Sequence, residues 1–157
     1  MSMYKSLKVL FLDIDGVLCL HEYGVINWDD NIDDYVFDEQ CCRRLKEIMD
    51  STGCKLALSS SWRLQKKDCL NILRQLKPFG ITSADFIGGT PLLEHRGDEI
   101  MTFVESHPEI GVFVAVDDED FSGDRFPADR LALTKIERGI TGPIKDLIIQ
   151  KLNGVSD

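Results

Sequence analysis

The sequence predicts an α/β fold in which a parallel β-sheet is covered by helices on both faces. Short apolar runs, typical of strands buried on both faces, alternate from end to end with segments of helical periodicity. The chain has 157 residues, of which 43% are hydrophobic and 29% charged, the composition of one ordinary globular domain. Because no internal repeat or linker interrupts this pattern, we expect a single domain over residues 1–157.

Two apolar runs in the first half of the chain predict buried strands. They are KVLFL at residues 8–12 and CKLALS at residues 54–59. Between them, residues 37–53 predict a helix, since apolar side chains recur every three or four positions. Asp38 is suited to cap the start of this helix, and Gly53 lies just past its end.

The following segment, residues 65–80, predicts a second helix that a proline and a glycine bring to an end. Leu70, Leu73 and Leu76 recur every three positions, so we expect all three on one side of this helix.

The second half of the chain continues the alternation of strands and helices. Short apolar runs predict strands at residues 84–89, 111–118 and 130–134. Helical spacing predicts helices at residues 96–107 and 142–152, the second of which has a proline in its first turn.

Polar side chains follow three of the predicted strands, at the point where each strand ends. Asp13 and Asp15 follow the first strand, serines 59–61 follow the second, and Asp117 and Asp118 follow the run at 111–118. Ligands of open parallel sheets bind beyond the carboxyl ends of the strands, so neighbouring strands would bring these groups into one pocket. Carboxylates gathered in this way repel one another, and a hard divalent cation such as Mg2+ is their natural counterweight.

Four segments resemble the motifs of the haloacid dehalogenase-like (HAD) superfamily. FLDIDGVL resembles its first motif, LALSSSW its second and FVAVDDED its fourth, while HRGDEI supplies Arg96 for the third. The likeness covers about residues 7–135 and is greatest to the compact phosphatase branch, including the phosphatase-like domains of RNA-repair proteins. It implies a three-layer α/β/α, Rossmann-like parallel sheet with a small flap and no large cap domain.

The resemblance also implies a chemistry, that of a Mg2+-dependent phosphatase acting on a phosphomonoester. Asp13 would attack phosphorus and carry an aspartyl-phosphate, and Asp15 would act as general acid and then general base. The Mg2+ ion would lie between the Asp13 carboxylate, the Asp15 backbone carbonyl and one acid of the fourth motif. Asp118 is preferred for that last place, and Asp117 is the alternative.

A hydroxyl and a cation would hold the transferring phosphoryl oxygens. We prefer Ser60 for the hydroxyl because it precedes Trp62 by two residues, as a threonine does in similar TSW sequences, with Ser59 as the alternative. Arg96 is preferred for the cation, and the lysine pair at 66–67 is the alternative.

Other side chains near these motifs admit both a structural and a functional interpretation. Arg63 could contact a substrate phosphate, but a surface position or a salt bridge is favoured, and Trp62 is expected to pack in the core rather than stack on a base. His21 and His107 are expected to be solvated, whereas His95 is placed near a pocket.

The spacing of the motifs limits what can cover the site. Residues 19–36 leave room only for a short flap, and residues 62–96 are taken up by one helix and one strand. We therefore expect an open site, which suits a phosphate on a large molecule such as a nucleic-acid end or a phosphoprotein. The flap carries three aromatic residues that either stack on a ring of the substrate or pack against the edge of the core: Tyr23, Trp28 and Tyr35.

The overall charge and the cysteines bear on the binding partners and the cellular location. A net charge of -9 argues against indiscriminate binding to nucleic-acid phosphates. Five cysteines without zinc spacing predict reduced thiols and a cytoplasmic location, and no apolar run is long enough for a membrane span. The oligomeric state is not predicted.

Two other function classes use part of the same pattern. A phosphoacceptor receiver domain also has acids at strand ends, but its acidic pair ends the first strand and its phosphoacceptor the third, the reverse of the order here. A non-catalytic binding or regulatory module with the same fold is disfavoured because every expected catalytic residue type is present.

Overall fold

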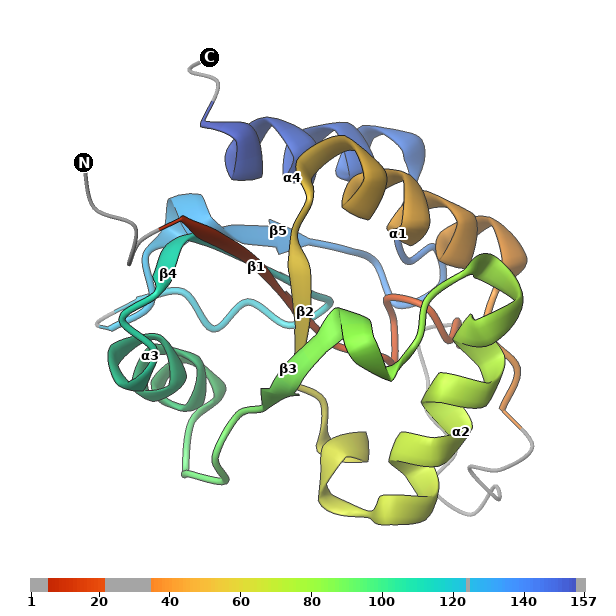
Figure 1. Ribbon diagram of the computed structural model, residues 1–157, viewed down its shortest axis with the longest axis horizontal. Helices are drawn as coiled ribbons and strands as arrows, with labels where there is room; N and C mark the ends of the chain where they lie inside the picture. The colour runs from red at the N-terminus through yellow and green to blue at the C-terminus, as the bar shows by residue number, and fades with distance from the viewer. Residues whose placement is uncertain (1–5, 22–34, 124, 155–157) are drawn as a thin grey trace.

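The computed structural model describes residues 6–21, 35–123 and 125–154, which form a five-stranded parallel sheet flanked by helices (Figure 1). The order of strands across the sheet is β3-β2-β1-β4-β5, and each neighbouring pair is parallel. The strands are β1 (Leu7–Leu12), β2 (Lys55–Leu58), β3 (Phe86–Gly89), β4 (Ile110–Asp117) and β5 (Leu131–Leu133). The predicted α/β fold is confirmed, and β1 lies at the centre of the sheet.

Within the described residues, four α-helices connect and cover the strands. They are α1 (Glu39–Thr52), α2 (Lys66–Leu76), α3 (Arg96–Ser106) and α4 (Gly142–Asn153), and four 3-10 turns complete the connections: η4 (Ser61–Leu64), η5 (Lys77–Phe79), η6 (Ser83–Asp85) and η7 (Ala128–Arg130). Helices α1 and α4 lie side by side on one side of the sheet, and α3 lies on the other (Figure 1). This arrangement is the predicted three-layer α/β/α sandwich.

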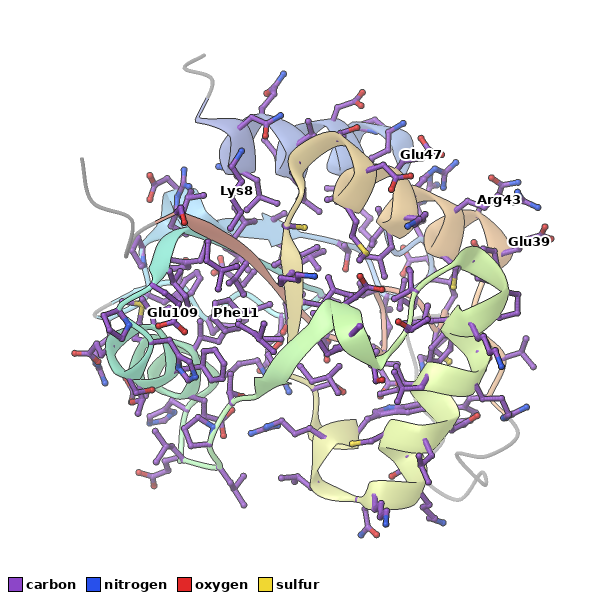
Figure 2. The ribbon with its side chains drawn as sticks, in the orientation of Figure 1. Lys8, Phe11, Glu39, Arg43, Glu47 and Glu109 are labelled. Carbon is purple, nitrogen blue, oxygen red and sulfur yellow. The ribbon has the colours of Figure 1, made fainter. Side chains whose placement is uncertain are left out.

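The central strand divides its side chains between two cores. Leu10 and Leu12 pack in a cluster with residues of α1, α2 and α4, whereas Val9 and Phe11 pack in a second cluster with residues of α3. Phe11 meets the ring of Phe103 edge-to-face at 5.5 Å, on the α3 side of the sheet (Figure 2). A strand buried on both faces must be apolar throughout, which explains the uninterrupted run in the sequence.

Helix α1 begins and ends where the sequence predicts. The Asp38 side chain accepts a hydrogen bond from the backbone N–H of Cys41 at 3.0 Å, and Gly53 ends the helix in the left-handed conformation with φ 72°. Both devices satisfy backbone groups that a helix terminus leaves without intrahelical partners.

The prediction that Leu70, Leu73 and Leu76 share one side of α2 is wrong in part. Leu76 is buried and Leu73 half-buried, but Leu70 is 55% exposed. A spacing of three falls short of the 3.6-residue turn, so Leu70 and Leu76 lie about 120° apart around the axis. The helix buries two polar residues in addition. Gln75 is half-buried and binds the chain before α1, because it accepts from the Phe37 N–H at 2.8 Å and donates to the Tyr35 carbonyl at 3.0 Å.

Residues 62–96 follow the short path that the sequence predicts. They form η4, α2, η5, η6 and β3 and then enter α3, so this stretch adds no cap domain to the sheet. Most of the predicted flap at 19–36, including Tyr23 and Trp28, lies outside the described residues, while Tyr35 packs against the edge of the core. Four of the five cysteines are buried, and all are free thiols. Among the helices that the structure describes, none has the length and apolar character needed to cross a membrane.

The turn after β5 passes close to the loop after β1. We therefore predict that Gly139, which lies in this turn, cannot be replaced by a larger residue without loss of stability. This glycine has φ 62°, and a Cβ there would overlap the Val17 carbonyl oxygen and lie 2.7 Å from a Leu20 methyl carbon. Gly53 has a similar φ of 72° with open space around it, which makes it a matched control. Both alanine variants incur the left-handed cost of about 1–2 kcal/mol, but Gly139→Ala also overpacks the turn at about 1–3 kcal/mol more.

Urea unfolding of the two variants measures this difference directly. A loss of unfolding free energy in Gly139→Ala equal to that in Gly53→Ala would show that the turn relaxes freely, against our expectation.

Candidate functional site

The carboxyl ends of β1, β2 and β4 meet at one edge of the sheet. The backbone N–H of Asp13 donates to the Val116 carbonyl at 3.3 Å, and that of Ser59 donates to the Leu12 carbonyl at 3.1 Å. These bonds extend the strand pairing by one residue on each side of β1. The three polar strand ends therefore converge as the sequence predicts, because β1 has β2 and β4 as its neighbours.

Three carboxylates form an acidic cluster at this edge. Oxygens of Asp13, Asp117 and Asp118 all lie within 4.8 Å of one another; Asp13 and Asp117 are buried, and Asp118 is half-buried. Asp118 approaches the backbone of Gly16, where a Cβ would lie 2.7 Å from its carboxyl carbon. Gly16 also has φ 78°, so both the turn and the close approach require glycine. Oxygen ligands at this spacing are the donor set that a hard divalent cation prefers.

Arg96 provides the positive charge of the cluster. Its guanidinium donates to Asp117 Oδ2 at 2.7 Å and lies 3.4 Å from Asp13 Oδ1. It stands at the first residue of α3, as the motif HRGDEI led us to expect. The alternative lysines at 66–67 are exposed on α2, so Arg96 is the cation that the structure brings to the acids.

Burial and crowding shift the pKa values of these groups. Burial, reinforced by Asp117, raises the pKa of Asp13 well above its ordinary value, against the opposing effect of Arg96. Burial likewise raises the pKa of Asp117 to about 6, although Arg96 and the Glu119 N–H act to lower it. Burial tends to lower the pKa of Arg96, but Asp117 and Asp13 outweigh it, so the guanidinium stays charged. One guanidinium therefore does not neutralise the cluster fully.

Asp15 lies apart from the acidic cluster, and a ring nitrogen lies against each of its carboxylate oxygens. Its Oδ1 lies 2.8 Å from Nε2 of His21, and its Oδ2 accepts from Nε1 of Trp62 at 3.0 Å. His21 is 8% exposed, so the prediction that it is solvated is wrong. Trp62 is 1% exposed, which confirms its position in the core and leaves no ring face for a base.

The two candidate serines have different surroundings. Ser60 Oγ accepts from the backbone N–H of Trp62 at 3.2 Å and caps the turn η4. Ser59 Oγ is buried, and it has no hydrogen-bond partner among the described residues. A buried hydroxyl without a partner is costly unless a ligand completes it. This contrast favours Ser59 over Ser60 as a ligand-binding group.

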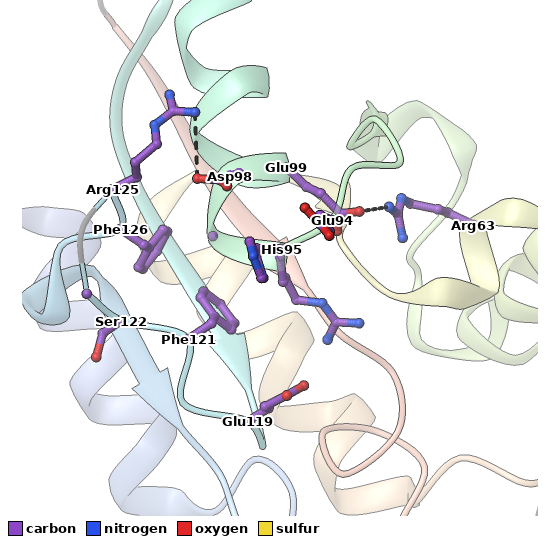
Figure 3. Close-up of a pocket in the computed structure, with 13 residues that line it drawn as sticks. Arg63, Glu94, His95, Asp98, Glu99, Glu119, Phe121, Ser122, Arg125 and Phe126 are labelled. Atoms are coloured by element: carbon purple, nitrogen blue, oxygen red, sulfur yellow. Dashed lines mark ion pairs between the residues drawn. The ribbon is translucent and has the colours of Figure 1, made fainter.

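Arg63 has the structural role that the sequence favoured. Its guanidinium lies 3.1 Å from the Glu99 carboxylate, and both side chains are almost wholly buried (Figure 3). It also donates to the carbonyls of Thr90 and Ser60, both at 2.8 Å. Arg63 thus ties η4 to the start of α3 and has little donor capacity left for a substrate.

Figure 3 shows the residues that line a polar cavity of about 690 Å³, and one of them is Arg96, which contacts the acidic cluster. It lies between the start of α3 and the segment after β4, and its lining includes Arg96, His95 and Phe121. The predicted place of His95 near a pocket is confirmed. His107 is half-buried rather than solvated, since its ring stacks on Phe103 with centroids 3.9 Å apart.

Residues 9–143 match the model of the family described as the HAD domain in Swiss Army Knife RNA repair proteins. The chain therefore belongs to this family of the haloacid dehalogenase-like superfamily. A solved HAD superfamily hydrolase (subfamily III A) from Legionella pneumophila is 20% identical, with a TM-score of 0.40, and the match covers 96% of this chain and 86% of that one. A search of curated proteins found no match.

The raised pKa of Asp117 predicts how stability depends on pH. Its folded pKa of about 6 exceeds the ordinary 3.8, so its contribution to stability is present below about pH 4 and lost as pH rises through 6. This difference corresponds to roughly 3 kcal/mol of unfolding free energy. Mg2+ bound to the cluster would offset the loss, because it replaces protons as the counter-charge.

Melting temperatures with EDTA or with millimolar MgCl2 test this dependence. We expect Mg2+ to raise the melting temperature much more at pH 8 than at pH 5, and to have little effect on the Asp118→Asn variant at either pH. An equal rise in melting temperature at both pH values in the wild type would contradict this pH dependence.

Proposed function

We propose that this chain is a Mg2+-dependent phosphatase that hydrolyses a phosphomonoester through an aspartyl-phosphate on Asp13. The observation that carries the proposal is the convergence of Asp13, Arg96 and the Asp117–Asp118 pair at one edge of the sheet. Membership of a HAD family supports the same reaction class.

Two carboxylates divide the proposed reaction between them. The Asp13 oxygen attacks phosphorus, the bond from phosphorus to the leaving oxygen breaks, and Asp15 gives its proton to that oxygen. A water molecule then attacks phosphorus in the aspartyl-phosphate, and Asp15 takes a proton from that water. The bond from phosphorus to the Asp13 oxygen breaks, which releases inorganic phosphate and restores the Asp13 carboxylate. Asp15 thus returns to its starting protonation state in each cycle.

The acidic cluster fits a Mg2+ ion. The Asp13 carboxylate, the Asp15 backbone carbonyl and Asp118 would hold it; Asp117 is less suited because its oxygens already accept from Arg96 and from the Glu119 N–H. When bound, Mg2+ supplies charge neutralisation for the phosphoryl oxygens. Asp117 then serves to hold Arg96 in place beside Asp13.

Arg96 and a strand-end hydroxyl would bind the phosphoryl oxygens. The guanidinium offers further N–H donors besides those bound to the acids. We assign the hydroxyl role to Ser59 in place of Ser60, because its Oγ is buried without a partner among the described residues. Donors fixed before the reaction stabilise charge that develops in the transition state.

The proposed substrate is a phosphate at the end of a large molecule. Residues 62–96 add no cap domain of the kind that encloses small substrates. The description of the matched family, which refers to RNA repair proteins, favours a nucleic-acid end over a phosphoprotein. The net charge of -9 disfavours binding to the phosphates along a nucleic-acid strand, so we propose that the protein recognises the terminal phosphate itself.

The proposed cellular setting is the cytoplasm. The five cysteines are free thiols, and burial raises the pKa of the Cys19, Cys41 and Cys42 thiols to about 12. Thiols so deeply protonated are packing groups, as expected in a reducing compartment. Immunolocalisation or fractionation measures this directly.

The nucleophile assignment predicts a complete loss of turnover in Asp13→Asn. An amide cannot form the phosphoenzyme, so release of p-nitrophenol from its phosphate should fall by at least about 10³-fold. Asp120→Asn is the matched control, because Asp120 lies on the same segment as Asp117 and Asp118 but is exposed and accepts from Ser122 instead.

Wild-type activity should require Mg2+ and disappear with EDTA. Equal rates with Mg2+ and EDTA, or no turnover of any phosphomonoester in a panel including 3'- and 5'-phosphorylated oligonucleotides, would overturn the proposal.

The two serines predict opposite outcomes of the same substitution. Ser59→Ala should lower kcat about tenfold or more, because it removes a hydroxyl donor to the phosphoryl group, with little change in stability. Ser60→Ala should leave kcat nearly unchanged and lower the unfolding free energy by about 1 kcal/mol, through loss of the η4 cap. The reverse pattern in steady-state kinetics and urea unfolding would return the role to Ser60.

A further inference from the structure

We propose that His21 is a positioning residue for Asp15, holding its carboxylate together with Trp62 in the orientation that proton transfer requires. This inference rests on the proposed phosphatase activity and adds to it a residue that none of the four motifs contains. The observation that carries it is the pair of nitrogen contacts on Asp15: His21 Nε2 lies 2.8 Å from Oδ1, and Trp62 Nε1 lies 3.0 Å from Oδ2.

The two contacts fix the carboxylate plane. An ionised carboxylate accepts hydrogen bonds but donates none, so His21 Nε2 must carry the hydrogen when Asp15 is charged. Each oxygen has two lone pairs, and one nitrogen donor occupies one of them. A lone pair on each oxygen therefore remains to exchange a proton, while rotation of the carboxylate would break both bonds.

His21 is itself held from two sides. Its backbone N–H donates to the Ile136 carbonyl at 3.1 Å, which ties it to the chain after β5. Its ring meets Tyr35 edge-to-face, with centroids 5.2 Å apart and planes at 75°. A ring that is 8% exposed and held in this way has few other orientations available, so the position of Nε2 is well defined.

Trp62, the donor to Asp15 Oδ2, is also held in place by its neighbours. Its indole is 1% exposed and packs against Phe37 and Tyr35, with ring centroids 5.7 and 6.5 Å away. Tyr35 thus contacts both side chains that hold Asp15. The aromatic cluster of Tyr35, Phe37 and Trp62, together with His21, forms a rigid support behind the proposed general acid.

A positioning role has a consequence that a merely structural role lacks. The proton from Asp15 matters most when the leaving oxygen is strongly basic, as in an alkyl phosphate, and least when it leaves readily as an anion, as in p-nitrophenyl phosphate. Misorientation of Asp15 should therefore slow the alkyl substrate far more than the aryl substrate. Partial unfolding or loss of metal would slow both equally.

The test compares three variants on both substrates. His21→Leu removes the donor to Oδ1, His21→Gln places an amide nitrogen near the position of Nε2, and Trp62→Phe removes the donor to Oδ2 but keeps an aromatic ring. We expect His21→Leu and Trp62→Phe to lower kcat/KM on an alkyl phosphate about tenfold to a hundredfold, against less than about threefold on p-nitrophenyl phosphate. His21→Gln should recover most of the loss.

A double-variant cycle shows whether His21 acts through Asp15. In an Asp15→Asn background, the burst of p-nitrophenolate from the first step should be the same with His21 or with leucine at that position. An additional loss there would show that His21 acts on something other than Asp15 and would overturn the inference.

The remaining outcomes separate this inference from the proposed function. No Mg2+-dependent turnover in the wild type overturns the phosphatase proposal and this inference with it. Wild-type turnover with an equal fold-loss on both substrates in the folded variants, or no recovery in His21→Gln, overturns the positioning role alone. If one of the two donor-removing variants fails to fold, the other carries the comparison, because each removes one of the two contacts on Asp15.

Discussion

The ion pair between Arg96 and the buried carboxylates of Asp13 and Asp117 is the interaction on which the site depends. Removing a charge from water costs free energy, and both of these carboxylates are buried. The guanidinium lies 2.7 Å from one and 3.4 Å from the other, which offsets part of that cost. The raised pKa values of both acids show that part of it remains. A site with excess buried negative charge favours a second cation.

The sheet order explains why the carboxylates meet at all. With β1 between β2 and β4, the residues that follow these three strands must share one edge. The loop after β1 contacts the segment after β5, because Thr134 Oγ1 donates to the Gly16 carbonyl at 2.6 Å. The backbone N–H of Thr134 donates to the Asp117 carbonyl at 2.8 Å, which ties the same segment to the end of β4. Gly16 lets Asp118 close onto that loop.

The surroundings of Asp13 and Asp15 differ, and the difference matches the catalytic roles proposed for them. Asp13 lies against Arg96, which also lines a polar cavity, and this positive charge would stabilise the negative charge of a phosphoryl group. Asp15 lies against His21 and Trp62 and the aromatic side chains behind them, a support that orients a carboxyl group without adding a permanent charge. One strand end thus presents the proposed nucleophile and the proposed proton carrier in separate environments.

The sequence by itself determined the features that local patterns encode. Continuous apolar runs defined buried parallel strands, Asp38 and Gly53 defined the ends of α1, and acids placed after strands defined the edge where the site lies. Only the tertiary structure showed which side chains meet there: it brought Arg96 to the acids and left the lysine pair at 66–67 exposed on α2. It also left the Ser59 hydroxyl without a partner among the described residues, next to the capping Ser60, and placed His21 against Asp15. It also brought Trp62 to Asp15 across 47 positions of sequence. Such contacts depend on the packing of distant segments, and a periodicity or a cap carries no information about them.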